Sequence, residues 1–135
     1  MLSHNQEHEL AMKTIYNHLF NMSINSIKDP VLLLEDIIEL PYEEIPLFIK
    51  EVVIKALIHL DDSLKLIEEN LVKWKLERMN KVTIAILVLG ITEAKYLPQE
   101  EVLKAAIIDV CVNMAKRFCG DKEYRFVNAI LDKVI

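Results

Sequence analysis

Basic side chains gather in two short stretches of this 135-residue chain. The first contains Lys73, Lys75, Arg78 and Lys81, and the second contains Lys116, Arg117, Lys122 and Arg125, with Tyr124 and Phe126 among them. Aromatic rings beside cations suit unpaired RNA, because bases stack on the rings while Lys and Arg neutralise the phosphates. By helical spacing, however, Phe126 shares a face with Ile130, which is the more usual pattern of a core residue. The pattern indicates an RNA-binding surface and leaves a core role for Phe126 open.

Other kinds of chemistry find little support in the sequence. His4 and His8 are four residues apart and could share one metal ion, but two ligands near a chain end are a weak metal signal. A glycine-rich phosphate loop, a Ser-His-Asp order or a Cys-His-Asn set cannot be assembled. We therefore expect no catalytic residues, no metal and no cofactor.

The distribution of charge is more informative than its total. The net charge of −5 argues weakly against a general nucleic-acid binder. Residues 1–70 carry 5 basic and 13 acidic side chains, whereas residues 71–135 carry 11 basic and 8 acidic ones. A polyanion should therefore meet the second half of the chain. The alternative is that helical surfaces simply differ in charge.

The elements that must position these residues are predicted to be helices throughout. Residues 82–91 are apolar except for Thr83 and Gly90, and a helix that is apolar nearly all round must be surrounded by other elements. It is too short for a membrane span, which needs roughly 20 apolar residues. With only 2 Gly and 4 Pro, and without hairpin turns, the chain is rich in helix formers. We predict a single all-α domain, residues 1–135, with about seven helices around this buried central helix.

Capping residues and prolines predict where the other helices begin and end. We expect helices over residues 7–22, 30 to about 40, 43 or 44 to about 59, from 61 or 62, from about 100 to 118, and from 121 to the C-terminus. The expected N-caps are Asp29, Asp61 or Asp62, and Asp121. Pro46 should lie in the first turn of the third helix, and Pro98 should end the connection after the central one.

The two cysteines indicate the redox setting. Cys111 and Cys119 lie eight residues apart, about 12 Å along one helix, which is too far for a disulfide. The first residues also lack the pattern of an export signal. Two free thiols suggest a reducing, cytoplasmic environment.

Four short sequence motifs in the second half of the chain, in order and in register, resemble those of the NusB family. These are WKLERMNKV, AILVLG-x-x-E, MAKRF and RFVNAILDKV. The resemblance covers residues 71–135 well and continues weakly near the N-terminus, where Ala11-x-x-x-Ile15-Tyr16 is similar to the family's Ala-x-x-x-Leu-Tyr. Any one of these motifs is a weak signal, but four motifs in register are a strong one.

The resemblance implies an all-α fold with two small packed bundles and a role in transcription antitermination. A factor of this family binds a boxA-type RNA together with a small-subunit ribosomal protein, within the transcription elongation complex. No membrane contact is implied, and a homodimer is left open. The candidate RNA-binding residues in this sequence are Lys13, Tyr16, Lys116, Arg117, Lys122, Arg125 and Phe126.

The N-terminus departs from the family pattern and supports a second hypothesis. The family typically has arginines before its first helix that help to hold RNA, whereas this chain has His4, Asn5, Gln6 and His8. Each lost phosphate contact weakens binding and flattens its dependence on salt. The alternative function is a NusB-fold protein–protein interaction module with weakened or lost RNA binding. In that case acids such as Glu7 and Glu9 should interrupt the positive surface.

Three positions that are charged in the family are apolar here, namely Ile84, Val88 and Val110. A buried charge without its partner costs about 3–5 kcal/mol, whereas replacing a whole ion pair by apolar groups is often neutral. We therefore predict that Val110 is buried and touches Ile84 or Val88. The alternative is independent drift on surface faces.

Overall fold

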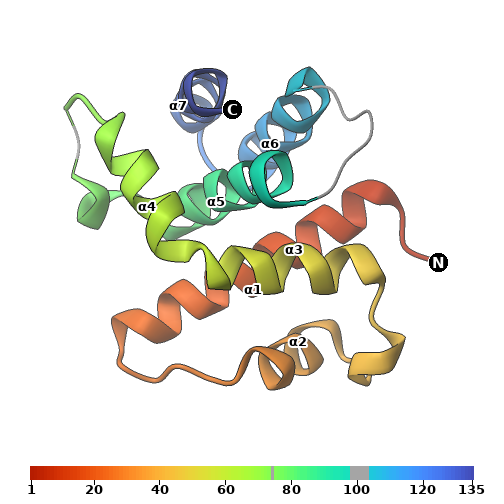
Figure 1. Ribbon diagram of the computed structural model, residues 1–135. Helices are drawn as coiled ribbons and strands as arrows, with labels where there is room; N and C mark the ends of the chain where they lie inside the picture. Colours follow the sequence, from red (N-terminus) through yellow and green to blue (C-terminus); the bar gives the residue numbers. More distant parts are fainter. Residues whose placement is uncertain (74, 98–103) are drawn as a thin grey trace.

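The computed structural model describes residues 1–73, 75–97 and 104–135, and within these it contains seven α-helices and no strand. The predicted all-α fold with about seven helices is thereby confirmed (Figure 1). Trp74, Pro98 and the expected start near Glu100 lie outside the described residues. The helices are α1 (His4–Ser23), α2 (Pro30–Ile38), α3 (Leu47–Ile58), α4 (Leu60–Glu69), α5 (Lys81–Tyr96), α6 (Lys104–Phe118) and α7 (Asp121–Val134).

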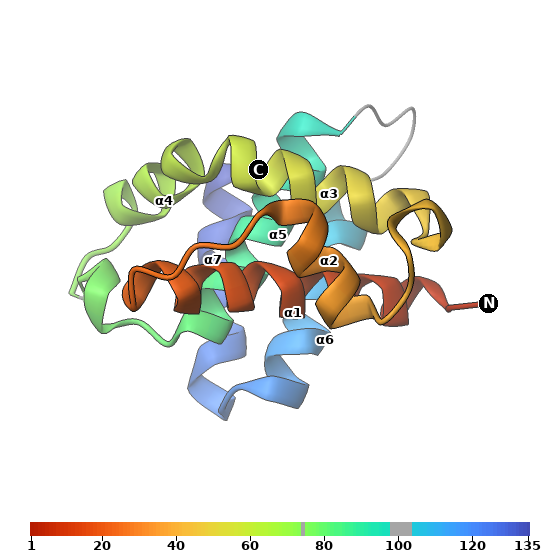
Figure 2. The ribbon, with the colours of Figure 1, turned by 90° about the horizontal axis from the view of Figure 1, so that it is seen from below.

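The helices form two layers that meet at α5. Helices α1, α2 and α3 lie together on one side, and α4, α6 and α7 pack around α5 on the other (Figures 1 and 2). Helix α5 also packs against α1 and α3, so it belongs to the contact between the layers. Within the described residues, none of the helices is both long and apolar enough to cross a membrane.

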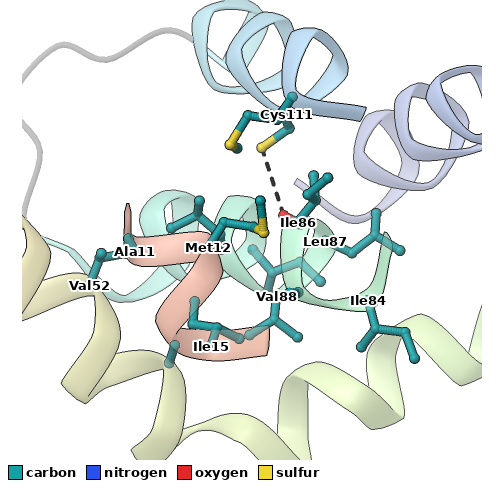
Figure 3. Close-up of a cluster of buried hydrophobic side chains, with 14 of the residues drawn as sticks. Ala11, Met12, Ile15, Val52, Ile84, Ile86, Leu87, Val88 and Cys111 are labelled. Atoms are coloured by element: carbon teal, nitrogen blue, oxygen red, sulfur yellow. Dashed lines mark hydrogen bonds between the residues drawn. The ribbon is translucent and has the colours of Figure 1, made fainter. Parts of the chain in front are cut away.

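The central helix is buried along nearly its whole length. Every residue from Thr83 to Glu93 is buried, as the prediction of a buried central helix requires, and Ala85, Ile86 and Leu89 have no exposed surface. Met12 of α1 belongs to the same buried apolar cluster as Ile86 and Val88 (Figure 3). A helix whose sides are all apolar finds a stable place only where other helices cover every side, which is the position that α5 occupies.

Gly90 allows α6 and α7 to approach α5 closely. A Cβ atom at this position would lie 3.0 Å from Cys111 Sγ and 3.2 Å from both terminal methyl carbons of Leu131. The buried Cys111 thiol also lies 3.8 Å from the carbonyl oxygen of Ile86, to which it donates a hydrogen bond (Figure 3). The absence of a side chain at Gly90 therefore serves the close packing of these three helices.

Three predicted helix starts need correction. Residues Tyr42–Glu44 form a separate 3-10 turn, and α3 begins only at Leu47, with Pro46 as its N-cap. The reason is Ile45, because the residue before a proline avoids the helical region and is extended here.

The other two corrections concern aspartates. Helix α4 follows α3 after the single residue His59, so Asp61 and Asp62 lie inside its first turn instead of capping it. Asp121 is likewise the first residue of α7, and Gly120 is its N-cap. Acids in a first turn still interact favourably with the helix dipole. By contrast, Asp29 does cap α2, since its carboxylate accepts hydrogen bonds from the backbone N–H groups of Val31 and Leu32.

The predicted burial of Val110 is wrong. This residue is half-buried and lines a small hollow between α1 and α6, together with Asn5 and Glu9 of α1. Ile84 and Val88 are buried, but Ile84 lines a different hollow that includes Leu64 of α4. The idea of one coupled apolar replacement between α5 and α6 therefore loses the burial on which it depended.

Candidate nucleic-acid interface

The end of α6 and the start of α7 bring the second basic group onto one exposed turn. Helix α6 ends at Phe118, and Gly120 leads directly into α7. The cations at the end of α6 and those at the start of α7 therefore face solvent within a few residues of each other. Lys116 and Arg117 occupy the last turn of α6, where positive charge is favoured by the helix dipole. Lys122 and Arg125 follow in the first part of α7 and are also exposed.

Two of these cations share the ring of Tyr124. Lys116 Nζ lies 5.0 Å and Arg125 Cζ 5.8 Å from the ring centroid. Arg125 Nε–H also donates a hydrogen bond to the Tyr124 hydroxyl oxygen at 3.4 Å. We call Lys116, Tyr124 and Arg125 the Tyr124 cluster. Its two positive charges beside a half-buried ring offer phosphate contacts and an aromatic edge in one place.

A second ring, Phe118, joins α6 to α1. Lys13 Nζ of α1 lies 5.7 Å and Arg117 Cζ 5.2 Å from its centroid, and 37% of Phe118 is exposed. We call Lys13, Arg117 and Phe118 the Phe118 cluster. It is the feature that brings the predicted residue Lys13 beside residues more than a hundred positions later in the chain. An exposed phenyl ring between two cations is suited to stacking with an unpaired base.

An acid interrupts this basic surface. Glu9 of α1 forms an ion pair with Arg117, and its side chain is 15% exposed whereas that of Arg117 is 62% exposed. Glu9 therefore reaches α6 from a largely covered position and neutralises one of the cations of the Phe118 cluster. This contact matches what the second hypothesis expected of Glu9.

The first basic group reaches the second at a cleft beside the start of α5. The cleft has a volume of about 250 Å³ and is lined by Arg78, Met79, Asn80, Lys122, Glu123 and Phe126. Phe126 is half-buried, so it both packs against the core and forms one wall of the cleft. This location combines the two roles that the sequence left open. Asn80 caps α5 by accepting a hydrogen bond from Val82 N–H.

Among the candidates outside the two clusters, Lys122 and Phe126 line the cleft, whereas Tyr16 belongs neither to a cluster nor to the cleft. It is half-buried and packs against the hydrophobic core from α1. Sequence reasoning missed Phe118 and noted Tyr124 among the cations without making it a candidate site residue. It also did not foresee the Glu9–Arg117 contact. The aromatic residues immediately beside Arg117 and Arg125 were the available signal, whereas the partner of Glu9 depends on how α1 lies against α6.

His8 has a structural role between α1 and α5. It is completely buried, with Nδ1 2.8 Å from the carbonyl oxygen of His4 and Nε2 2.9 Å from Glu93 Oε2. A carbonyl and a carboxylate both accept hydrogen bonds, so an imidazolium that donates from both nitrogens fits this geometry. Burial alone would lower the pKa of His8, but hydrogen bonds and nearby carboxylates outweigh it and raise that pKa. The pair fixes the first turns of α1 against α5.

Comparison with known proteins agrees with this arrangement. The model of the NusB family matches residues 5–135. The chain belongs to the NusB family. The transcription antitermination protein NusB of Borreliella burgdorferi is 33% identical over 93% of this chain and 89% of its own length. That of Finegoldia magna is 36% identical, and the alignment spans 65% of this chain but only 63% of that protein.

Solved NusB structures have the same fold. NusB from T. maritima superposes with a TM-score of 0.80 at 25% identity, covering 98% of this chain and 90% of that one. A structure described as antitermination factors NusB and NusE in complex with double-stranded RNA gives a TM-score of 0.77 at 21% identity. The sequence motifs that resemble the NusB family coincide with the features described above. Gly90 and Glu93 lie on α5, and Phe118 and Phe126 lie around the basic turn.

Proposed function

We propose that this protein acts in transcription antitermination by binding a boxA-type RNA together with a small-subunit ribosomal protein, within the transcription elongation complex in the cytoplasm. The observation that carries the proposal is the Tyr124 cluster, in which Lys116 and Arg125 lie against one ring on an exposed turn. The proposed role is binding and assembly, without a chemical step catalysed by this chain.

The chemistry of the surface fits single-stranded RNA better than a regular duplex. Bases of an unpaired strand can stack on aromatic rings, whereas duplex RNA is recognised mainly through its shape, phosphates and 2′-hydroxyls. The Tyr124 and Phe118 clusters place two rings beside four cations, namely Lys13, Lys116, Arg117 and Arg125.

The structure of NusB and NusE in complex with double-stranded RNA supports joint binding of RNA and protein by this fold.

A specific observation favours the second candidate function, a protein–protein module with weakened RNA binding. Glu9 forms an ion pair with Arg117, and the N-terminal positions that carry arginine in the family are His4, Asn5, Gln6 and His8 here. The first feature neutralises a cation of α6, and the second leaves the start of α1 without the family's positive charges. In this second function the ribosomal protein would supply much of the RNA affinity of the assembly.

A titration of labelled boxA-like RNA separates the two functions. We expect the protein to bind this RNA alone and to bind it more tightly when the ribosomal protein is present. Replacing Lys116 and Arg125 by alanine should reduce the slope of log affinity against log salt by about 1.4 if each cation meets one phosphate of a single strand. The loss should be similar for a scrambled RNA, because phosphate contacts carry no sequence information.

The matched control removes two other exposed or partly exposed cations. Lys28 pairs with Asp36 at 3.7 Å, and Lys50 lies 4.8 Å from the centroid of the Tyr42 ring, in the layer of α2 and α3. The double change Lys28→Ala and Lys50→Ala should leave RNA affinity within about twofold. Equal losses in both double variants would refute the placement of the surface. Binding only in the presence of the ribosomal protein would favour the second function.

A further inference from the structure

The contact between Glu9 and Arg117 closes off one cation of the candidate RNA surface. Glu9 and Lys13 are four residues apart on α1 and so project from the same side of that helix, toward the end of α6. Glu9 also shares the small hollow between α1 and α6 with Asn5, Val110, Asn113, Met114 and Arg117. The carboxylate therefore approaches the guanidinium from the protein side, while Arg117 keeps its outer side in solvent.

We propose that Glu9 sets the RNA affinity of this surface by holding Arg117 and competing with phosphate for its charge. The inference rests on the proposed RNA-binding function and adds a residue that limits it. A carboxylate in contact with the guanidinium cancels most of its attraction for a phosphate, and it repels the phosphate as well. With Glu9 in place, the Phe118 cluster offers Lys13 as its one uncompensated cation toward RNA.

The effect should be independent of RNA sequence. Arg117 in this position would meet the backbone of the RNA, and such contacts position a strand without reading its bases. Releasing one cation adds about 0.7 to the slope of log affinity against log salt for a single strand, which corresponds to about fivefold between 1 M and 0.1 M salt. Glu9 thus lowers the binding of any RNA by this chain on its own.

The decisive variant is Glu9→Gln, which keeps the shape of the side chain and removes its charge. We expect about fivefold tighter binding of boxA-like and scrambled RNA near 0.1 M salt, with the steeper salt dependence given above. In an Arg117→Gln background the same change should bring less than a twofold gain. Melting curves followed by circular dichroism confirm that each variant is folded, since an ion pair with so exposed an arginine contributes little to stability.

Glu7→Gln is the matched control. Glu7 lies two positions before Glu9 and therefore on the opposite side of α1. The Glu7→Gln change thus removes the same charge as Glu9→Gln without releasing Arg117. An equal gain from Glu7→Gln would overturn the inference, because net charge alone would then explain the result. An undiminished gain in the Arg117→Gln background, or weaker binding by Glu9→Gln, would also overturn it.

The experiment distinguishes this inference from the proposed function. If the unmodified protein binds RNA and Glu9→Gln changes nothing, only the inference fails. If the unmodified protein binds no RNA but Glu9→Gln does, the inference is supported and the second function is favoured. If neither binds RNA, with or without the ribosomal protein, both the inference and the RNA-binding function fail.

Discussion

The buried contact between His8 and Glu93 couples the stability of the protein to pH. Burial lowers the pKa of His8, but the hydrogen bonds to Glu93 and to the His4 carbonyl, with the charges of Glu93 and Glu7, raise it above its ordinary value of 6.5. A group whose pKa is higher in the folded state stabilises that state when it is protonated. The contribution is therefore complete below about pH 6.5 and is lost as the pH rises through the raised pKa.

We predict that replacing His8 by glutamine removes this part of the pH dependence. The melting temperature of the unmodified protein, measured by circular dichroism, should fall relative to that of His8→Gln as the pH rises above about 6.5. The comparison cancels the titration of groups that the two proteins share. Parallel melting profiles for the two proteins would contradict a charged His8 in the folded state.

At the scale of elements, the contact of α5 with α6 and α7 depends on Gly90. Alanine would favour the helix by about 1 kcal/mol, but extra atoms in a packed core typically cost about 1–3 kcal/mol. Because the new Cβ would lie 3.0 Å from Cys111 Sγ and 3.2 Å from the Leu131 methyl carbons, we predict a net loss of about 1 kcal/mol for Gly90→Ala. Urea denaturation measures this change.

A second variant tests whether crowding is the cause. Removing the sulfur with Cys111→Ala should reduce the cost of Gly90→Ala, since the two positions share one contact and their effects should not add. If Gly90→Ala is as stable as the unmodified protein, the close approach of α6 is not limited by this contact.

At the scale of the whole molecule, we propose that residues 1–135 unfold as one domain. Helix α5 packs against helices of both layers, so its loss removes support from each. Leu89→Ala should cost about 2–5 kcal/mol, because Leu89 has no exposed surface, while Leu47→Ala, at a residue that is 66% exposed, should stay within about 0.5 kcal/mol. Calorimetry should show one transition with equal calorimetric and van't Hoff enthalpies in all three proteins. Two separate transitions would refute a single cooperative domain.

Several features of this protein follow from the sequence alone. The almost wholly apolar run of α5 requires a helix enclosed on all sides, and Asp29-Pro30 specifies the start of α2 through a local hydrogen bond. Both depend on residues that are close in the chain. The basic residues at the end of α6 and the start of α7 are exposed for a similarly local reason, because charges stay in water unless a partner compensates their burial.

Tertiary structure alone decided how distant residues meet. The contact of Glu9 with Arg117, that of Lys13 with Phe118 and that of His8 with Glu93 all join α1 to helices of the second half of the chain. Helical spacing says which side of α1 these residues share, but the helix that covers that side is set by the packing of all the apolar faces together. For the same reason Val110 is half-buried beside α1, since its surroundings depend on the neighbour of α6 and not on the pattern of α6 itself.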